Sequence, residues 1–187
     1  MNKKRCPWPS NDPLMIEYHD QEWGLPVHDD LKLFEHIILD AFQAGLSWKT
    51  ILHKRENFRQ AFDQFDYVKI AAYNSRKTEK LMLNEGIIRN RLKIDAAVKN
   101  AQATIKLIEK YGSLDNYLWG FVDGKPITNH WTTLSKIPAS TPLSDKISKD
   151  LKNNGFSFVG STICYAFLQA AGLVNDHLIE CFRHKEV

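Results

Sequence analysis

The chain has 187 residues, of which 43% are hydrophobic and 25% are charged, enough to bury one sizeable core. This composition excludes a disordered or fibrous protein. We find neither a run of eighteen apolar residues nor an apolar segment behind the basic start, so we predict no membrane span and no signal peptide. We therefore expect a cytoplasmic protein. Its formal net charge of +3 permits a nucleic-acid partner without requiring one.

Helical spacing of apolar residues dominates the chain, and no two-residue alternation stands out, so we predict an all-α fold. The first strong pattern is an apolar stripe formed by Leu33, Phe34, Ile37, Ala41 and Ala44. Either Asp29 or Asp30 can cap the start of this helix, and Gly45 ends it.

Shorter helices and one long helix follow. The shorter ones are expected at about 49–62, 66–73 and 75–83, and the long one follows Gly86 and stops near Gly112. A proline-containing loop then precedes a charged helix at 144–155 and an apolar C-terminal helix. No repeat or long linker interrupts the pattern, so we expect one domain over residues 1–187, which could be bilobal. We also expect a monomer.

Four soft-metal ligands stand near the two ends of the chain, namely Cys6, His19, His177 and Cys181. Two thiolates and two imidazoles suit a closed tetrahedral zinc site, and the i, i+4 spacing of the second pair would place both on one helix face. Alternatively, the cysteines are ordinary thiols and the histidines lie on helix surfaces. The third cysteine, Cys164, lies in an apolar run and is expected in the core.

Tryptophan is frequent, and four of the five residues, Trp8, Trp23, Trp48 and Trp119, lie in predicted loops or helix ends. Such side chains make flat walls for a ring-shaped ligand, although core filling is the commoner role of any one tryptophan.

A helix, a short turn at Gly86 and a second helix form a candidate helix-hairpin-helix. Ile87 and Ile88 would pack the turn, and basic residues follow at once. Amides at the start of the second helix suit a phosphate oxygen. A plain corner between two helices is the equal alternative.

Asp40 is the unusual residue of its helix, because at 100° per residue it lies at the edge of the apolar stripe. An interior carboxylate needs a partner or a function, and a paired structural role is the simpler explanation for an isolated residue. Tyr18 and Trp48 add hydrogen-bonding and stacking groups within the same stretch of sequence.

Taken together, these segments resemble the bacterial 3-methyladenine DNA glycosylase I family, a branch of the helix-hairpin-helix glycosylases. The resemblance rests on RCPWPSNDPLMIEYHDQEWG, LFEHIILDAFQAGLSWKTIL, KRENFRQAF, GIIRNRLKI and GFSFVGSTICYAFLQAAGLVNDHLIEC, in that order. It implies an all-α DNA repair hydrolase that excises N3-methyladenine from double-stranded alkylated DNA, releasing the free base and leaving an abasic site.

The resemblance also implies roles for matched residues. It places one structural zinc per chain on Cys6, His19, His177 and Cys181. It places Asp40, Tyr18 and Trp48 at the catalytic base pocket, with Trp8 and Trp23 as its walls. DNA contacts would come from Gly45, Leu46, Gly86, Ile87, Ile88, Arg89 and Arg91. No lysine stands out as an imine-forming nucleophile, so a monofunctional enzyme is expected.

One position departs from the family, which characteristically has Glu where this chain has Asp40, and Ala41 and Phe42 are also atypical. The side chain of Asp is one methylene shorter than that of Glu. Either a water bridges the gap, the backbone shifts, or recognition of the base is altered. Two other functions therefore stay open. The protein could bind DNA or modified bases without excising them, or it could be a zinc hydrolase in which water replaces one of the four ligands.

Overall fold

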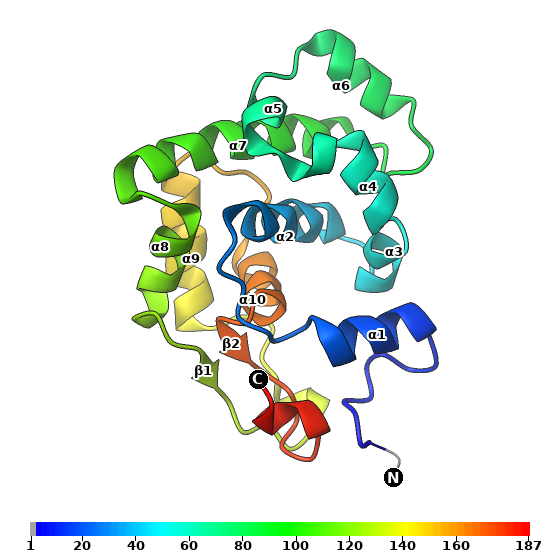
Figure 1. Cartoon of the computed structure of the whole chain (residues 1–187), viewed down its shortest axis with the longest axis vertical. Helices are drawn as coiled ribbons and strands as arrows, with labels where there is room; N and C mark the ends of the chain where they lie inside the picture. Colours follow the sequence, from blue (N-terminus) through cyan, green and yellow to red (C-terminus); the bar gives the residue numbers. More distant parts are fainter. Residues whose placement is uncertain (1–2) are drawn as a thin grey trace.

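The computed structural model describes residues 3–187 as helices gathered around one central helix, α2 (Figure 1). The α-helices are α1 (Pro13–Gln21), α2 (Asp30–Gln43), α3 (Trp48–Leu52), α4 (Arg55–Ala61), α5 (Tyr67–Ala71), α6 (Ser75–Met82), α7 (Arg91–Tyr111), α8 (Leu114–Trp119), α9 (Pro142–Asn153) and α10 (Ser161–Ala170). Short 3-10 helices cover Asp63–Phe65, Gly120–Val122, Leu134–Lys136 and Phe182–Lys185. The predicted all-α fold is confirmed.

The one β element among the described residues is a pair of two-residue strands. β1 (Ile127–Thr128) and β2 (Val174–Asn175) pair in parallel, with Ile127 opposite Val174. This pair holds the long loop before α9 against the C-terminal segment. No helix within residues 3–187 has the length and apolar character needed to cross a membrane.

Capping residues explain where the main helices begin and end. Asp29 caps α2 by accepting a hydrogen bond from the Lys32 amide at 2.9 Å. The neighbouring Asp30 instead accepts from the amide of Asp115 at 2.9 Å, at the start of α8. Gly112 ends α7 with φ of 87°, a backbone conformation that favours glycine. The predicted 49–62 helix is split between α3 and α4.

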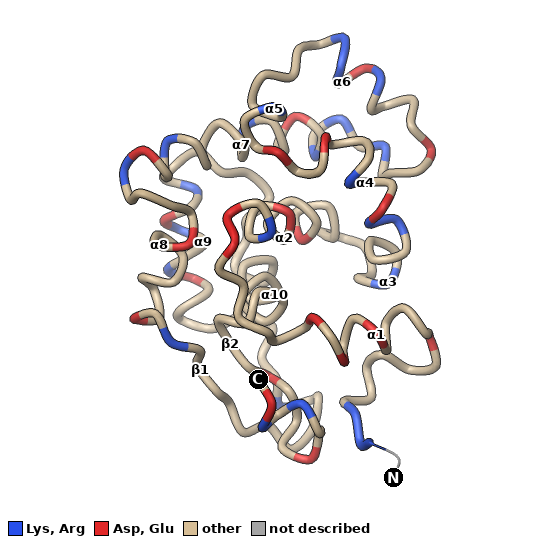
Figure 2. The backbone as a smooth tube through the Cα atoms, viewed as in Figure 1, with Lys and Arg blue, Asp and Glu red and all other residues tan. Residues whose placement is uncertain are grey.

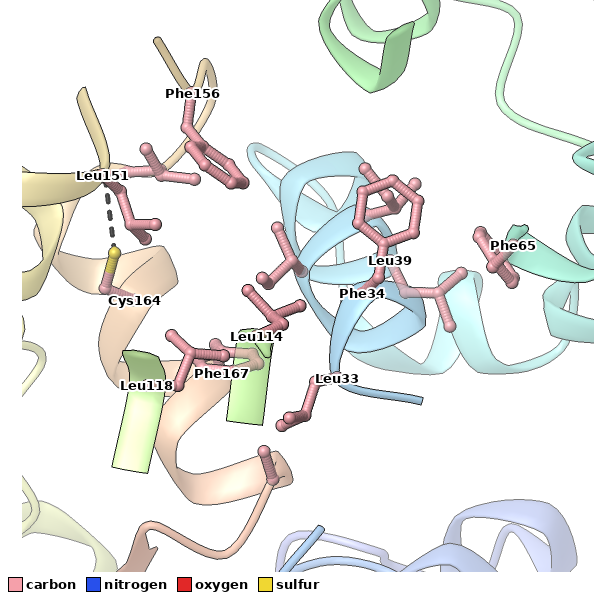
Figure 3. Close-up of a cluster of buried hydrophobic side chains, with 14 of the residues drawn as sticks. Leu33, Phe34, Leu39, Phe65, Leu114, Leu118, Leu151, Phe156, Cys164 and Phe167 are labelled. Carbon is pink, nitrogen blue, oxygen red and sulfur yellow. Dashed lines mark hydrogen bonds between the residues drawn. The ribbon is translucent and has the colours of Figure 1, made fainter. Parts of the chain in front are cut away.

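The main hydrophobic core surrounds α2, which packs against α7, α8 and α10. In the close-up of Figure 3, Leu39 of α2 points toward Phe65, while Phe167 of α10 lies with Leu114 of α8 on another side of α2. Cys164 is buried here, 2% exposed, as predicted. Because α2 is covered on several sides, a polar group that it carries inward loses water.

A second, smaller cluster of buried residues joins the two ends of the chain. It includes Cys6, Tyr18, Trp23 and Cys181, from segments that lie far apart in the sequence. The backbone supports the same junction, because the Phe182 amide donates to the Lys4 carbonyl at 2.9 Å. The two chain ends therefore lie on the same part of the molecule (Figure 1).

Candidate active site and metal centre

A cavity of about 310 Å³ opens beside the second cluster. The N-terminal loop, α1, α2, α3, α10 and the loop after Leu134–Lys136 all contribute to its walls. All five residues expected at the base pocket line it, namely Trp8, Tyr18, Trp23, Asp40 and Trp48. The structure thus brings together side chains from separate segments of the chain.

The aromatic walls of the cavity form a connected set. The rings of Tyr18 and Trp48 are 5.1 Å apart between centroids, and those of Trp8 and Trp23 are also 5.1 Å apart. The indole nitrogens of Trp8 and Trp48 are buried and have no hydrogen-bond partner among the described residues. A flat ligand between these walls would gain stacking area and could satisfy such donors.

Asp40 supplies the one carboxylate among the lining side chains. It is 2% exposed, and its Oδ2 has no partner within residues 3–187. Burial raises the pKa of this carboxyl well above its usual range. The simpler expectation of a paired structural aspartate is therefore not met at Oδ2, which leaves an acceptor for a ligand.

Tyr18 lies close enough to Asp40 for the negative charge of Asp40 to affect ionisation of the Tyr18 hydroxyl. Burial, followed by the negative charge of Asp40, raises the pKa of the Tyr18 hydroxyl well above its usual range. The hydroxyl therefore keeps its proton at neutral pH and can act as a hydrogen-bond donor. The cavity combines the Tyr18 hydroxyl, the Asp40 carboxylate and aromatic rings that pack edge-on or tilted against one another.

The four predicted metal ligands converge next to this cavity. Their ligand atoms all lie within 4.8 Å of one another. Cys181 Sγ is 3.4 Å from His19 Nε2 and 3.6 Å from His177 Nδ1, and Cys6 Sγ is 3.7 Å from His177 Nδ1. Zinc bonds of about 2.0–2.3 Å in a tetrahedron place the ligand atoms about 3.5 Å apart. The cluster could hold a metal ion of that kind.

Neighbouring groups orient both histidines of the cluster. His177 Nε2 lies 3.0 Å from the Trp23 carbonyl, and His19 Nδ1 lies 2.8 Å from Asp20 Oδ1. Asp20 also accepts from Arg5 at 2.7 Å. Against the effect of partial burial, the hydrogen bonds from Arg5 and His19 lower the pKa of Asp20, which keeps it ionised. Such outer contacts fix which imidazole nitrogen faces a metal.

The two cysteine thiols of the cluster differ in the direction of their pKa shifts. A hydrogen bond from Cys6, supported by His177 and His19, outweighs burial and lowers the pKa of the Cys181 thiol. The same contact with Cys181, together with burial, raises the pKa of Cys6. The expectation that His177 and Cys181 share one helix face was wrong. They lie in a turn after β2, where chain reversal, rather than helical periodicity, brings them together.

The predicted base-stack wedge is an exposed turn between α2 and α3. Gly45 has φ of 78°, and the Leu46 side chain is 41% exposed. Ser47 then caps α3 by accepting from the Thr50 amide at 3.2 Å. The turn stands at the end of the helix that carries Asp40, so it borders the cavity.

The candidate hairpin lies in the segment that joins α6 to α7. Ile87 is buried, 3% exposed, and packs the turn. The Gly86 amide donates to Asn84 Oδ1 at 2.8 Å, so this amide is already satisfied. A side chain at Gly86 would press on Asn57 at 3.1 Å, which explains the glycine.

The two arginines of the hairpin are paired with acidic side chains. Arg91 donates to Glu79 at 2.7 Å, and Arg89 lies 3.4 Å from Glu85. Figure 2 shows basic and acidic positions interspersed along α6. Because these pairs are exposed, they contribute little stability and can rearrange around an incoming anion.

Several residues of the cavity were missed from the sequence. Gln43 lies one turn beyond Asp40 on α2, a spacing that could have indicated it. Gln169 lines the cavity from α10 and donates to Asp176 at 2.7 Å, and its polar side chain interrupts an apolar run. Ile137 comes from the loop, and nothing in the local sequence indicates its place.

Two larger clefts, of about 490 and 500 Å³, lie elsewhere on the described surface. Neither has a Trp, Tyr or Phe in its lining. In the larger one, Arg55 pairs with Glu22 at 2.5 Å and Arg59 pairs with Glu35 at 2.8 Å, so these charges are compensated. The aromatic cavity is the better candidate for a ring-shaped ligand.

The same fold is found in a class of DNA glycosylases. DNA-3-methyladenine glycosylase 1 of Escherichia coli (strain K12) is 52% identical over 178 residues, 95% of each chain. The Haemophilus influenzae DNA-3-methyladenine glycosylase is 49% identical over 178 residues, 95% of this chain and 96% of that one. A crystal structure of a 3-methyladenine DNA glycosylase I variant in complex with 3-methyladenine has a TM-score of 0.93, at 36% identity over 95% of this chain and 96% of that one.

The family described as methyladenine glycosylase matches residues 8–184. The matched range includes the whole aromatic cavity and three of the four clustered ligands, Cys6 lying just before it. The chain belongs to the methyladenine glycosylase family.

Proposed function

We propose that this protein excises 3-methyladenine from alkylated DNA by hydrolysing the N-glycosidic bond. The observation that carries the proposal is the open cavity whose aromatic walls accompany the unpaired Oδ2 of Asp40. The relatives named above act on this lesion or bind its base. The test is release of free base from methylated duplex DNA, with the released products identified by chromatography and undamaged DNA as the control.

Recognition of charge accounts for the selectivity. N3-methylation makes adenine cationic, so the base is a good leaving group that needs little protonation. Electron-rich faces such as that of Trp48 attract a cation, and Asp40 can accept hydrogen bonds from the amino edge of the base. Normal adenine gains neither charge-dependent interaction, so it would be bound less tightly.

We propose that the enzyme is monofunctional. No lysine of residues 3–187 lines the aromatic cavity, so none of these side chains is placed to form an imine with the sugar. The product would be an abasic site in an uncut strand. Borohydride trapping of a covalent protein–DNA adduct during turnover would contradict this.

We propose that double-stranded DNA contacts two exposed features, the Gly45–Leu46 turn and the hairpin from Gly86 to Arg91. Leu46 is 41% exposed and can fill the space left by an extruded nucleotide. The first amides of a helix such as α7 have no partner within the helix, which suits a phosphate, although the Lys93 amide already donates to the Asn90 side chain. Arg89 and Arg91 would exchange their carboxylate partners for phosphates. We propose that the protein binds DNA as a monomer.

We propose that the cluster of Cys6, His19, His177 and Cys181 holds one structural zinc ion. Two thiols and two imidazoles with the spacing described above match a closed tetrahedral site, and all four positions are taken by side chains. A bound zinc would cross-link the two chain ends and leave no position for a reacting water. This arrangement argues against the zinc hydrolase alternative.

A further inference from the structure

Lys93 is a buried lysine that the proposed chemistry does not use. Its side chain lies within the structure, 7% exposed, although lysine is among the residues least often buried. Its Nζ donates to the carbonyl of Phe42 at 2.7 Å and to that of Ala44 at 2.6 Å. Within the part of the chain that the structure describes, it has no carboxylate partner, and burial lowers its pKa.

The position of Lys93 is unfavourable for the helix that carries it. Asn90 caps α7, so Lys93 occupies the third helical position, where a positive charge opposes the helix dipole. The same charge is favourable at the end of α2, whose last carbonyls need donors. Lys93 therefore stabilises the end of α2 at the expense of the start of α7.

The two carbonyls lie at the junction between the cavity and the exposed turn. Phe42 and Ala44 follow Asp40 on the same helix, and Gly45 and Leu46 come next. On the other side, Lys93 lies two residues after Arg91, where the hairpin ends. One ammonium group thus links the hairpin to the turn that carries Leu46.

We propose that Lys93 is a positioning residue for base extrusion. It holds the Gly45–Leu46 turn in a fixed orientation relative to the hairpin. When the hairpin is seated on backbone phosphates, Leu46 is then aligned with the base stack. This inference rests on the proposed DNA contacts of the turn and the hairpin. It assigns Lys93 no contact with the base, because Lys93 does not line the cavity.

The test compares Lys93→Met, which keeps the stem and removes the charge, with Lys99→Met, which removes an exposed lysine from the same helix. Single-turnover release of 3-methyladenine is measured from a duplex and from a single strand carrying the same lesion. Loss of charge-assisted hydrogen bonds should slow release from the duplex by about tenfold or more. Release from the single strand should change little, because that substrate needs no extrusion from a stack. Lys99→Met should match the wild type on both.

Binding of the free base distinguishes a positioning role of Lys93 from a purely structural one. Binding of free 3-methyladenine, followed by tryptophan fluorescence, should be unchanged in Lys93→Met if only the turn is misaligned. Equal losses on duplex, single strand and free base would overturn the proposal, as would a wild-type rate on the duplex. If Lys93→Met does not fold, Lys93→Gln keeps an amide donor at the carbonyls and should show the same selective loss in smaller degree.

The variant Leu46→Ala distinguishes failure of the Lys93 proposal from failure of the proposed DNA contacts on which it rests. If Leu46→Ala releases base from the duplex at the wild-type rate, the wedge assignment fails, and the Lys93 proposal fails with it. If Leu46→Ala is slow on the duplex while Lys93→Met is not, only the Lys93 proposal is wrong.

Discussion

Replacing Asp40 by asparagine tests the proposed base recognition most directly. The substitution keeps the shape of the side chain and removes its ability to carry a negative charge. Asp40 is almost fully buried, and its Oδ2 is free to accept from a ligand. A charge-assisted hydrogen bond contributes about 1.5–3 kcal/mol, which corresponds to roughly a ten- to a hundredfold loss in excision rate. Single-turnover release of 3-methyladenine measures this loss.

The stability of the Asn variant should move in the opposite direction. Burial raises the pKa of Asp40 in the folded protein, so above about pH 4, the ordinary aspartate pKa, the unfolded chain gives up this proton more readily than the folded one. The wild type therefore loses stability as pH rises through that window towards the raised pKa, whereas Asn does not titrate. We expect the melting temperature of Asp40→Asn to equal or exceed that of the wild type at neutral pH.

Two further variants complete this test. Asp95→Asn, which removes a carboxylate from α7 outside the aromatic cavity, is the matched control and should leave excision unchanged. Asp40→Glu should keep or raise activity if the shorter side chain limits contact with the base. If Asp40→Asn releases 3-methyladenine at the wild-type rate, recognition must instead reside in Tyr18 and Trp48, and Asp40 is a structural carboxylate.

Three other predictions concern the metal, the DNA surface and the stacking wall. The purified protein should carry about one zinc per chain by metal analysis. Cys181→Ala should lose the metal and have a lower melting temperature, while the fraction that stays folded still excises the base. A chelator that stops excision without loosening the fold would contradict this. Reversing the charges of Arg89 and Arg91 should weaken binding to damaged and undamaged duplexes alike and flatten the salt dependence of the dissociation constant, whereas Lys149→Glu on α9 should not. Trp48→Ala should weaken binding of free 3-methyladenine, measured by calorimetry, by roughly 1–3 kcal/mol for one lost stacking face; unchanged affinity would remove Trp48 from the wall.

Local sequence was sufficient for much of the helical frame. The apolar stripe, the cap at Asp29 or Asp30 and the stop at Gly45 placed α2 closely, and Gly112 marked the end of α7. These signals depend on neighbours three or four residues away, so they can be read along the chain. Helix α1 was missed because its apolar residues do not recur with a clear helical period. Its buried side chains, such as Met15 and Tyr18, belong to the second cluster.

The residues of the candidate site were identified mainly through the resemblance of whole segments to a family. Residue spacing alone did not assign a function to the ligand cluster, to Asp40 or to the hairpin, because each also had a simpler structural explanation. Spacing also misled in one case, since His177 and Cys181 are four apart but lie in a turn rather than on a helix. The i, i+4 relation constrains geometry only where the backbone is helical.

Contacts between distant segments were decided by the tertiary structure. The sequence by itself determined which residue types were available, including the carboxylate at position 40 and the lysine at 93. Packing of α7 and α10 around α2 determined that Asp40 faces a cavity with a free oxygen and that Lys93 reaches the end of another helix. Ile137 reaches the cavity from a loop whose earlier part pairs with the C-terminal segment through β1 and β2. Such contacts depend on the relative placement of whole elements, which no local period encodes.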